Sequence, residues 1–322
     1  MKTTQFLIFI LLSLSSVLAN NTCDLHKETD VLMGDKRLTS FWAQEYIGAD
    51  FVRLEMNEYV KSKNIPKPNV AIFDLGFEEE FVNLTEELLV PKQMNGKRTM
   101  RARHGTSVAN LINGDFPYGM TDHLNLIRLG RVSGSMYRYH FMHFEKTQRY
   151  PKIISNSVGW GGEQDKDIAE LAYDKNILWF LAAGNKYPEP VVDFEVSSKA
   201  IMIGSLAPSG LQSFNTQTHN DIIILAPGNE ELATINGYGE HGLFGETSGA
   251  TPLVAGTMVN IAALLPSITR EQTISLLEKS GFQSIENMQG NLDAPGVLNS
   301  YKAFKVAQSI YEKCQDNLEC ID

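Results

Sequence analysis

The sequence predicts one α/β domain with a mostly parallel central sheet and helices on both of its faces. Short apolar runs alternate along the chain with segments of helical periodicity, and one long segment near the C-terminal end is apolar on nearly every side. Buried strands that alternate with helices are typical of βαβ units. The 322 residues are 43% hydrophobic and 20% charged, which suits a globular protein.

Six apolar runs are short enough to be strands of this sheet, and helical patterns lie between them. The expected strands are residues 70–73, 126–129, 153–154, 177–182, 201–203 and 222–225. The expected helices include residues 106–112 and 168–174. This alternation fits a single domain rather than two.

The apolar segment 248–265 predicts a helix buried on all sides. Pro252 lies within its opening turns, where a missing backbone N–H costs least. Thr269 and Gln272 then form the pattern of a capping box, which predicts a surface helix ending near Gly281.

The N-terminus predicts export from the cell. Lys2 is followed by the apolar run 6–14, and small or apolar residues occupy positions 17–19, as in a secretory signal peptide. That run is too short to span a bilayer, and no later stretch is long enough, so we expect a secreted protein (extracellular or periplasmic) without a membrane anchor. The expected divisions are a signal peptide (1–19), a short segment (20–40), the globular domain (41–310) and a C-terminal tail (311–322).

Charge and cysteine content limit the partners. The net charge of −10, without a long basic run, argues against nucleic acid or an anionic membrane as partner.

Cys23, Cys314 and Cys320 all lie near the ends of the chain. In an oxidising compartment we expect a disulfide that holds one tail and leaves one thiol over, but the pairing stays open.

Two polar residues stand where a site could form. Asp74 follows the strand 70–73, and the carboxyl ends of parallel strands carry the sites of open sheets. His104 opens the helical segment His-Gly-Thr-Ser-Val-Ala, and a helix N-terminus would help to keep its imidazole neutral. Taken alone, Asp74 is as well explained as a turn residue and His104 as a structural histidine.

Two further residues complete the set. Ser248 lies at the start of the buried helix, beside backbone N–H groups suited to an oxyanion. Asn185 ends the run 180–184, where its amide can supply a second donor. A helix cap and a turn are their simpler explanations. No GxSxG pattern is present, which argues against a lipase or esterase of the α/β-hydrolase type.

The segments around Asp74, His104, Asn185 and Ser248 resemble, in this order, the signature segments of the subtilisin-like serine proteases, or subtilases. The resemblance implies a three-layer subtilisin-like fold and a secreted endopeptidase that works through an acyl-enzyme. It implies Ser248 as nucleophile, His104 as general base and acid, Asp74 as the carboxylate that orients the imidazole, and Asn185 as oxyanion donor.

The resemblance also implies which residues bind the substrate. Two uncharged segments would form the walls around the residue before the cut: Ser157, Val158, Gly159, Ala182, Ala183 and Gly184. We therefore expect an apolar or broad preference there, with the peptide added as a strand along Val158 and Gly159. No cofactor is expected for the chemistry. Structural calcium is common in the family and stays possible here, but no DxDxDG-like loop is present and the sequence assigns no metal ligands. We expect a monomer.

Three positions depart from the family pattern. Leu75 replaces a hydroxyl residue after Asp74, Glu246 replaces a glycine before the nucleophile, and Gly249 replaces a methionine after it. An active enzyme would need Glu246 turned towards solvent, because its charge would repel an oxyanion. Gly249 would enlarge the site. These departures keep an alternative open: a catalytically inactive pseudoprotease that serves as a secreted binding module.

Overall fold

The computed structural model describes most of the chain. The described residues are 41–81, 100–130, 136–158, 166–189, 198–217, 221–229, 232–282 and 295–314. The chain divides into two compact units, Met1–Trp42 and Ala43–Asp322, and the second contains the sheet. The predicted signal peptide and the segment 20–40 lie outside the described residues.

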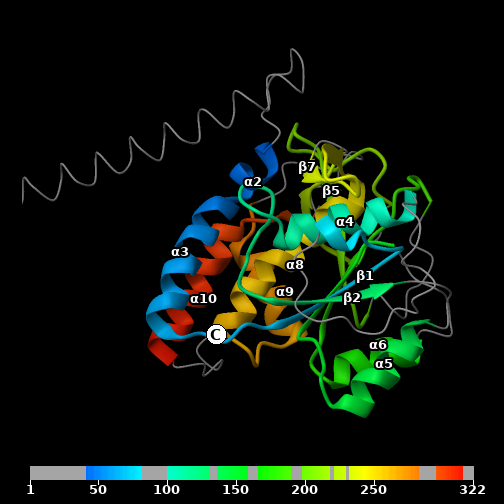
Figure 1. The fold of residues 1–322 in the computed structure, drawn as a ribbon. Coiled ribbons are helices and arrows are strands. Elements are labelled where there is room, and N and C mark those ends of the chain that lie inside the picture. The colour runs from blue at the N-terminus through cyan, green and yellow to red at the C-terminus, as the bar shows by residue number, and fades with distance from the viewer. Residues whose placement is uncertain are drawn as a thin grey trace, which may run out of the picture. The chain divides into compact units, whose positions relative to one another are not determined.

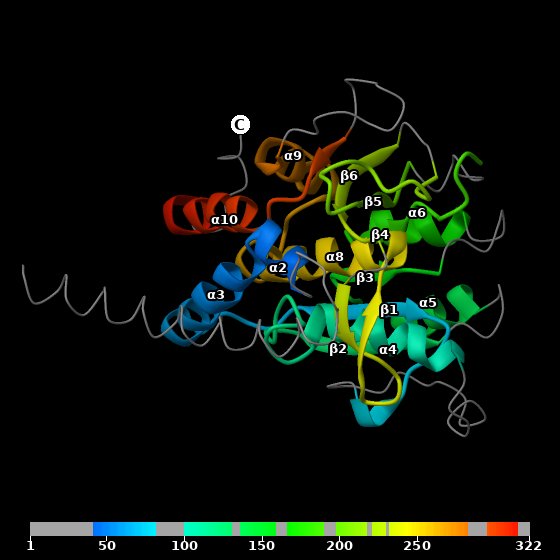
Figure 2. The same cartoon turned by 90° about the horizontal axis from the view of Figure 1, so that it is seen from above.

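The core of the second unit is a seven-stranded parallel sheet in the order β2-β1-β3-β4-β5-β6-β9 (Figures 1 and 2). Its strands are β1 (Asn69–Asp74), β2 (Asn125–Gly130), β3 (Ile153–Asn156), β4 (Leu178–Ala182), β5 (Ile201–Leu206), β6 (Ile222–Pro227) and β9 (Gly296–Val297). The predicted α/β class with a mostly parallel sheet is confirmed, and each of the six predicted strands is present. The two-residue strand β9 was too short to be predicted.

Alternation along β1 decides which side chains face which helices. Phe73 belongs to a buried cluster with residues of α5 (Met136–Thr147) and α6 (Lys166–Asp174), and its ring stacks on Tyr137 at 3.7 Å between centroids. Neighbouring residues of a strand point to opposite faces, so Asp74 points to the other face. That face is covered by α4 (Met100–Asn113) and α8 (Glu246–Leu264), and Figure 1 shows α5 and α6 away from them.

Helix α8 is the central helix that the sequence predicted. Every described residue from Thr247 to Leu264 is buried, and the helix contacts four strands, β3 to β6, as well as α4. After it, α9 (Arg270–Ser280) begins with the predicted capping box: the Thr269 side chain accepts from the Gln272 backbone N–H, and the Gln272 side chain accepts from that of Thr269. The helix ends at Gly281, as predicted.

Smaller elements complete the fold. They are α2 (Trp42–Ile47), α3 (Ala49–Lys63), the 3₁₀ turn η1 (Glu79–Phe81), β7 (Leu232–Ile235), β8 (His241–Phe244) and α10 (Ser300–Cys314). α10 packs on α3 and α8, and it extends to Cys314, beyond residue 310. The antiparallel hairpin of β7 and β8 packs on α4, where Thr234 donates to the carbonyl oxygen of Ser107 at 3.1 Å.

Candidate active site

Asp74 lies at the carboxyl end of β1 with its side chain fully buried. The backbone N–H of Leu75 donates to its Oδ1 atom at 2.7 Å, so a main-chain donor supports the carboxylate although Leu75 carries no hydroxyl. Gly105 of α4 allows the close approach of the helix. A Cβ there would lie 2.2 Å from the carbonyl oxygen of Gly76 and 3.1 Å from Asp74 Oδ1. The chain therefore packs α4 directly against this carboxylate at Gly105.

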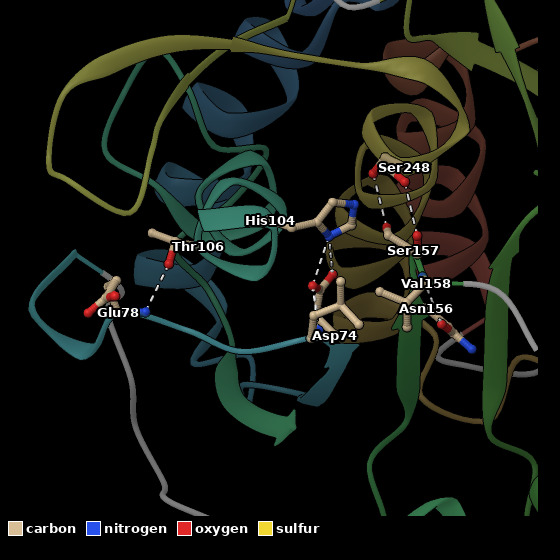
Figure 3. Close-up of polar contacts among 9 residues, drawn as sticks. Asp74, Glu78, His104, Thr106, Asn156, Ser157, Val158 and Ser248 are labelled. Atoms are coloured by element: carbon tan, nitrogen blue, oxygen red, sulfur yellow. Dashed lines mark hydrogen bonds and ion pairs between the residues drawn. The ribbon is translucent and has the colours of Figure 1, made fainter. Parts of the chain in front are cut away.

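His104 contacts Asp74 through one edge of its ring. Nδ1 lies 2.8 Å from Oδ1 and 3.0 Å from Oδ2 of Asp74 (Figure 3). Because an ionised carboxylate can only accept, Nδ1 carries the hydrogen, and in the neutral ring the lone pair is then on Nε2. Phe244 of β8 lies edge to face with the ring, at 5.0 Å between centroids. The ring is thus fixed from two sides, and a quarter of the side chain stays exposed.

The sequence argument about the charge of His104 is corrected by its surroundings. α4 begins at Met100, four residues earlier than expected for a helix that His104 would open. Burial acts most strongly and lowers the pKa of His104, but the charge of Asp74, its hydrogen bond to the ring and the charge of Glu246 together outweigh burial. The pKa therefore lies above its usual value, so these contacts favour the protonated imidazole.

Ser248 is the third residue of α8, where a helix leaves backbone N–H groups without an acceptor of its own. Its carbonyl oxygen accepts the hydroxyl of Ser157 at 3.0 Å, and its own hydroxyl donates to the carbonyl oxygen of Ser157 at 2.9 Å. Pro252 explains the first bond, since it lacks the N–H that would otherwise bind the Ser248 carbonyl in the helix. The start of α8 is thereby attached to the segment that follows β3.

The imidazole lies between Asp74 and Ser248 in the view of Figure 3, with Nδ1 on the Asp74 side. Among the hydrogen bonds of the described residues, the Ser248 hydroxyl donates to Ser157 and not to His104. Transfer of its proton to Nε2 therefore requires the hydroxyl to give up its bond to Ser157 and turn to His104. Catalytic hydrogen bonds such as the one to His104 are often absent before substrate binds and form in its presence.

Asn185 is held in one orientation by its neighbours. Its Oδ1 accepts from the backbone N–H of Thr247 at 3.1 Å and from the Thr247 hydroxyl at 2.6 Å. Its Nδ2 donates to Glu246 Oε2 at 2.5 Å. An amide nitrogen has two hydrogens, so one remains for a substrate oxygen.

Glu246 does not have the solvent-facing orientation that the sequence argument requires of an active enzyme. The side chain is half-buried, and its second oxygen accepts from Nδ2 of Asn215 at 2.5 Å. An oxyanion about 5 Å from this carboxylate would be repelled by about 3 kcal/mol at an effective dielectric near 20. The backbone of Glu246 has φ of 56°, a left-handed conformation that is unusual outside glycine.

The residues expected around the substrate lie at the ends of two neighbouring strands. Ser157 and Val158 follow β3, and Ala182 to Gly184 end and follow β4, while Gly159 lies outside the described residues. The backbone N–H of Val158 donates to Asn156 Oδ1 at 3.2 Å. A peptide that adds along Val158 would therefore have to compete for this N–H group.

Gly249 does not enlarge the site in the way expected. A Cβ at this position would lie 2.6 Å from Cδ1 of Leu232 and 3.7 Å from the ring of Phe244. The hairpin of β7 and β8 therefore fills the space beside the glycine. Sequence reasoning could not find this, because nothing in the sequence indicated that Leu232 and Phe244 would pack there.

Two wider searches concern only the residues that the structure describes. No group of three or more His, Cys, Asp or Glu side chains gathers there as metal ligands would. None of the helices in these ranges is long and apolar enough to cross a membrane. The side chains of the three cysteines lie outside what is described, so the expected disulfide stays a prediction.

Comparison with known proteins decides the family. The model of the subtilase family matches residues 69–301, which is more than half of the chain and includes Asp74, His104, Asn185 and Ser248. The chain is a subtilase. Membership supports a serine protease, in agreement with the resemblance in the signature segments. No curated protein matches this subtilase in sequence.

Solved structures agree with the fold of the subtilase. The patellamide maturation protease PatA has a TM-score of 0.62 and 18% identity, over 76% of this chain and 98% of that one. A cold-adapted subtilisin-like serine proteinase has a TM-score of 0.59 and 20% identity, over 72% and 88%. The structure of the subtilase cytotoxin SubAB has a TM-score of 0.60 and 18% identity, over 85% of this chain and 99% of that one. At these identities the likeness establishes the three-layer subtilisin-like fold and nothing finer.

Proposed function

We propose that this subtilase is a secreted serine endopeptidase in which Asp74, His104 and Ser248 form the catalytic triad. The observation that carries the proposal is the contact of His104 Nδ1 with the buried Asp74, which directs the opposite nitrogen of the ring away from the carboxylate. Ser248, at the start of a buried helix, supports the role of nucleophile. All three residues lie within the range that the subtilase family model matches.

The chemistry follows from these contacts. Ser248 Oγ attacks the carbonyl carbon of the substrate while His104 Nε2 takes the hydroxyl proton, and the carbonyl oxygen gains negative charge. The second N–H of Asn185 and the backbone N–H of Ser248 are the donors for that oxygen, at the positive end of α8. His104 then gives its proton to the leaving amine, the C–N bond breaks, and water hydrolyses the acyl-enzyme by the same route.

Substrate and compartment are part of the proposal. Ser157, Val158, Ala182, Ala183 and Gly184, none of them charged, favour an apolar or broad choice of residue before the cut. Together with Gly159, they are the proposed binding segments for peptide or protein substrates. The signal-peptide pattern at the N-terminus supports secretion, and the proposed mechanism needs no cofactor.

Covalent labelling tests the proposal directly. The purified protein without residues 1–19 is treated with a fluorophosphonate, and the modified peptide is identified by mass spectrometry. We expect one label on Ser248, loss of the label in Ser248→Ala, and parallel loss of casein hydrolysis. A wild-type protein that neither labels at Ser248 nor cleaves a broad peptide library would refute the function.

A second candidate is the inactive binding module. Two observations favour it: the Ser248 hydroxyl donates to Ser157 rather than His104, and Glu246 contacts the amide of the proposed oxyanion donor. Rapid mixing with a peptide ester separates the two candidates, because an enzyme gives a burst of acyl-enzyme and a binding module gives peptide binding without one.

A further inference from the structure

The carboxylate of Glu246 lies between two amides at the proposed oxyanion site. Asn185 and Asn215 each donate one N–H to it, at 2.5 Å in both cases. The same carboxylate is close enough to His104 to add to the rise of its pKa. In the proposed mechanism His104 protonates the leaving amine, so a charge that acts on His104 can also act on the leaving half of the substrate.

A second acceptor lies beside the carboxylate. Asn215 uses its Nδ2 on Glu246, and its Oδ1 is buried without a hydrogen-bond partner among the described residues. A buried acceptor left in this state is costly, and a ligand that brings N–H groups would satisfy it. Carboxylate and carbonyl oxygen together accept and do not donate, which is complementary to a cation with several N–H groups.

We propose that Glu246 and Asn215 select substrates with a cationic side chain, guanidinium or ammonium, on the residue directly after the cut. This specificity rests on the proposed function and names which substrates that site prefers. The cation pairs with the carboxylate and offsets its charge when the oxyanion forms. A neutral side chain does not offset the repulsion between Glu246 and the oxyanion.

An acyl-transfer experiment measures the preference for the residue directly after the cut. A peptidyl methyl ester with an apolar acyl residue forms the acyl-enzyme, which then partitions between water and an added amine. The amine binds where the leaving group was. Argininamide and citrullinamide form a matched pair, because citrulline keeps the shape of arginine and lacks its charge.

We expect half of the wild-type acyl-enzyme to be captured at an argininamide concentration about tenfold lower than the citrullinamide concentration needed. One partly buried ion pair would give a difference of this size. In Glu246→Gln the two amines should capture the acyl-enzyme equally well, mainly because citrullinamide becomes a better acceptor once the carboxylate is gone. Glu240→Gln serves as the control: Glu240 is exposed, and its substitution also removes one negative charge. It should retain the tenfold difference.

The possible outcomes distinguish the two proposals. The proposed specificity is overturned if the two amines capture the wild-type acyl-enzyme equally, or if argininamide stays the better acceptor in Glu246→Gln. Turnover of the ester in the same experiment would still support the proposed protease. Absence of any acyl-enzyme overturns both. The wild-type comparison stands by itself if Glu246→Gln does not fold, and Glu246→Gly then supplies a second variant without the carboxylate.

Discussion

Ser157 and Ser248 are joined by two crossed hydrogen bonds, in which the hydroxyl of each donates to the carbonyl oxygen of the other. Pro252 leaves the Ser248 carbonyl available for this by having no N–H. The position of the proposed nucleophile Ser248 therefore depends on Ser157, which follows β3, and on Pro252, one turn further along α8.

This relationship predicts a double-mutant cycle. Ser157→Ala should lower the free energy of unfolding by about 1–3 kcal/mol, because the buried carbonyl of Ser248 loses its donor. In Ser157→Ala with Pro252→Ala the loss should be smaller than in Ser157→Ala alone, since the introduced alanine supplies a helical N–H that the proline lacks. Urea unfolding of all forms in a Ser248→Ala background, which prevents self-digestion, provides the measurement. Strictly additive effects would contradict the proposed role of Pro252.

The oxyanion role of Asn185 predicts a change in turnover rather than in binding. Asn185→Leu should lower kcat by about 10²–10³ with little change in KM, because its donor acts only on the transition state. Asn215→Leu is the control, since it also removes an amide bound to Glu246. If both variants lose turnover to the same extent, the effect arises from Glu246 and not from a donor to the oxyanion.

The raised pKa of His104 predicts the pH dependence of catalysis. The imidazole must be neutral to accept a proton, and its protonated form persists to higher pH when the pKa is raised. The acidic limb of the kcat/KM profile should therefore lie above pH 6.5, the ordinary pKa of histidine. In Glu246→Gln the limb should move to lower pH, because one of the charges that raise the pKa is gone. A limb at or below 6.5 in the wild type would refute this.

Gly105 predicts a steric effect on the Asp74 side chain. Gly105→Ala would place a Cβ 2.2 Å from the Gly76 carbonyl oxygen, so we expect a loss of about 1–3 kcal/mol in stability and a lower kcat. Gly242→Ala is the matched control, because its Cβ would come no closer than 3.3 Å to its neighbours. Thermal unfolding and peptide hydrolysis of both variants test the difference. Comparable losses in the two would show that alanine itself, rather than the clash, is responsible.

The sequence predicted six of the seven strands, the central helix and the elements that carry four polar residues of the proposed site. Apolar runs determine buried strands, and α8 is apolar all round because it contacts strands on one side and helices on the other. Asp74 could be placed because β1 ends there, and Ser248 because α8 begins there. These signals are local, and each can be read without knowing which other segments pack nearby.

The remaining features depend on segments that are far apart in the sequence. Phe244 reaches His104 only through a hairpin whose strand β8 alternates between half-buried and exposed residues, so it carries no clear apolar run. Asn215 lies in a loop without a recognisable motif. No sequence pattern indicated the left-handed backbone of Glu246. The charge of Glu246 adds to a rise in the pKa of His104 that comes mainly from Asp74.

The left-handed backbone at Glu246 also bears on how this site evolves. Glycine adopts that conformation without the cost of about 1–2 kcal/mol that a side chain adds. A glycine codon is one base change away from either glutamate codon. A single point mutation would therefore remove both the backbone cost and the carboxylate.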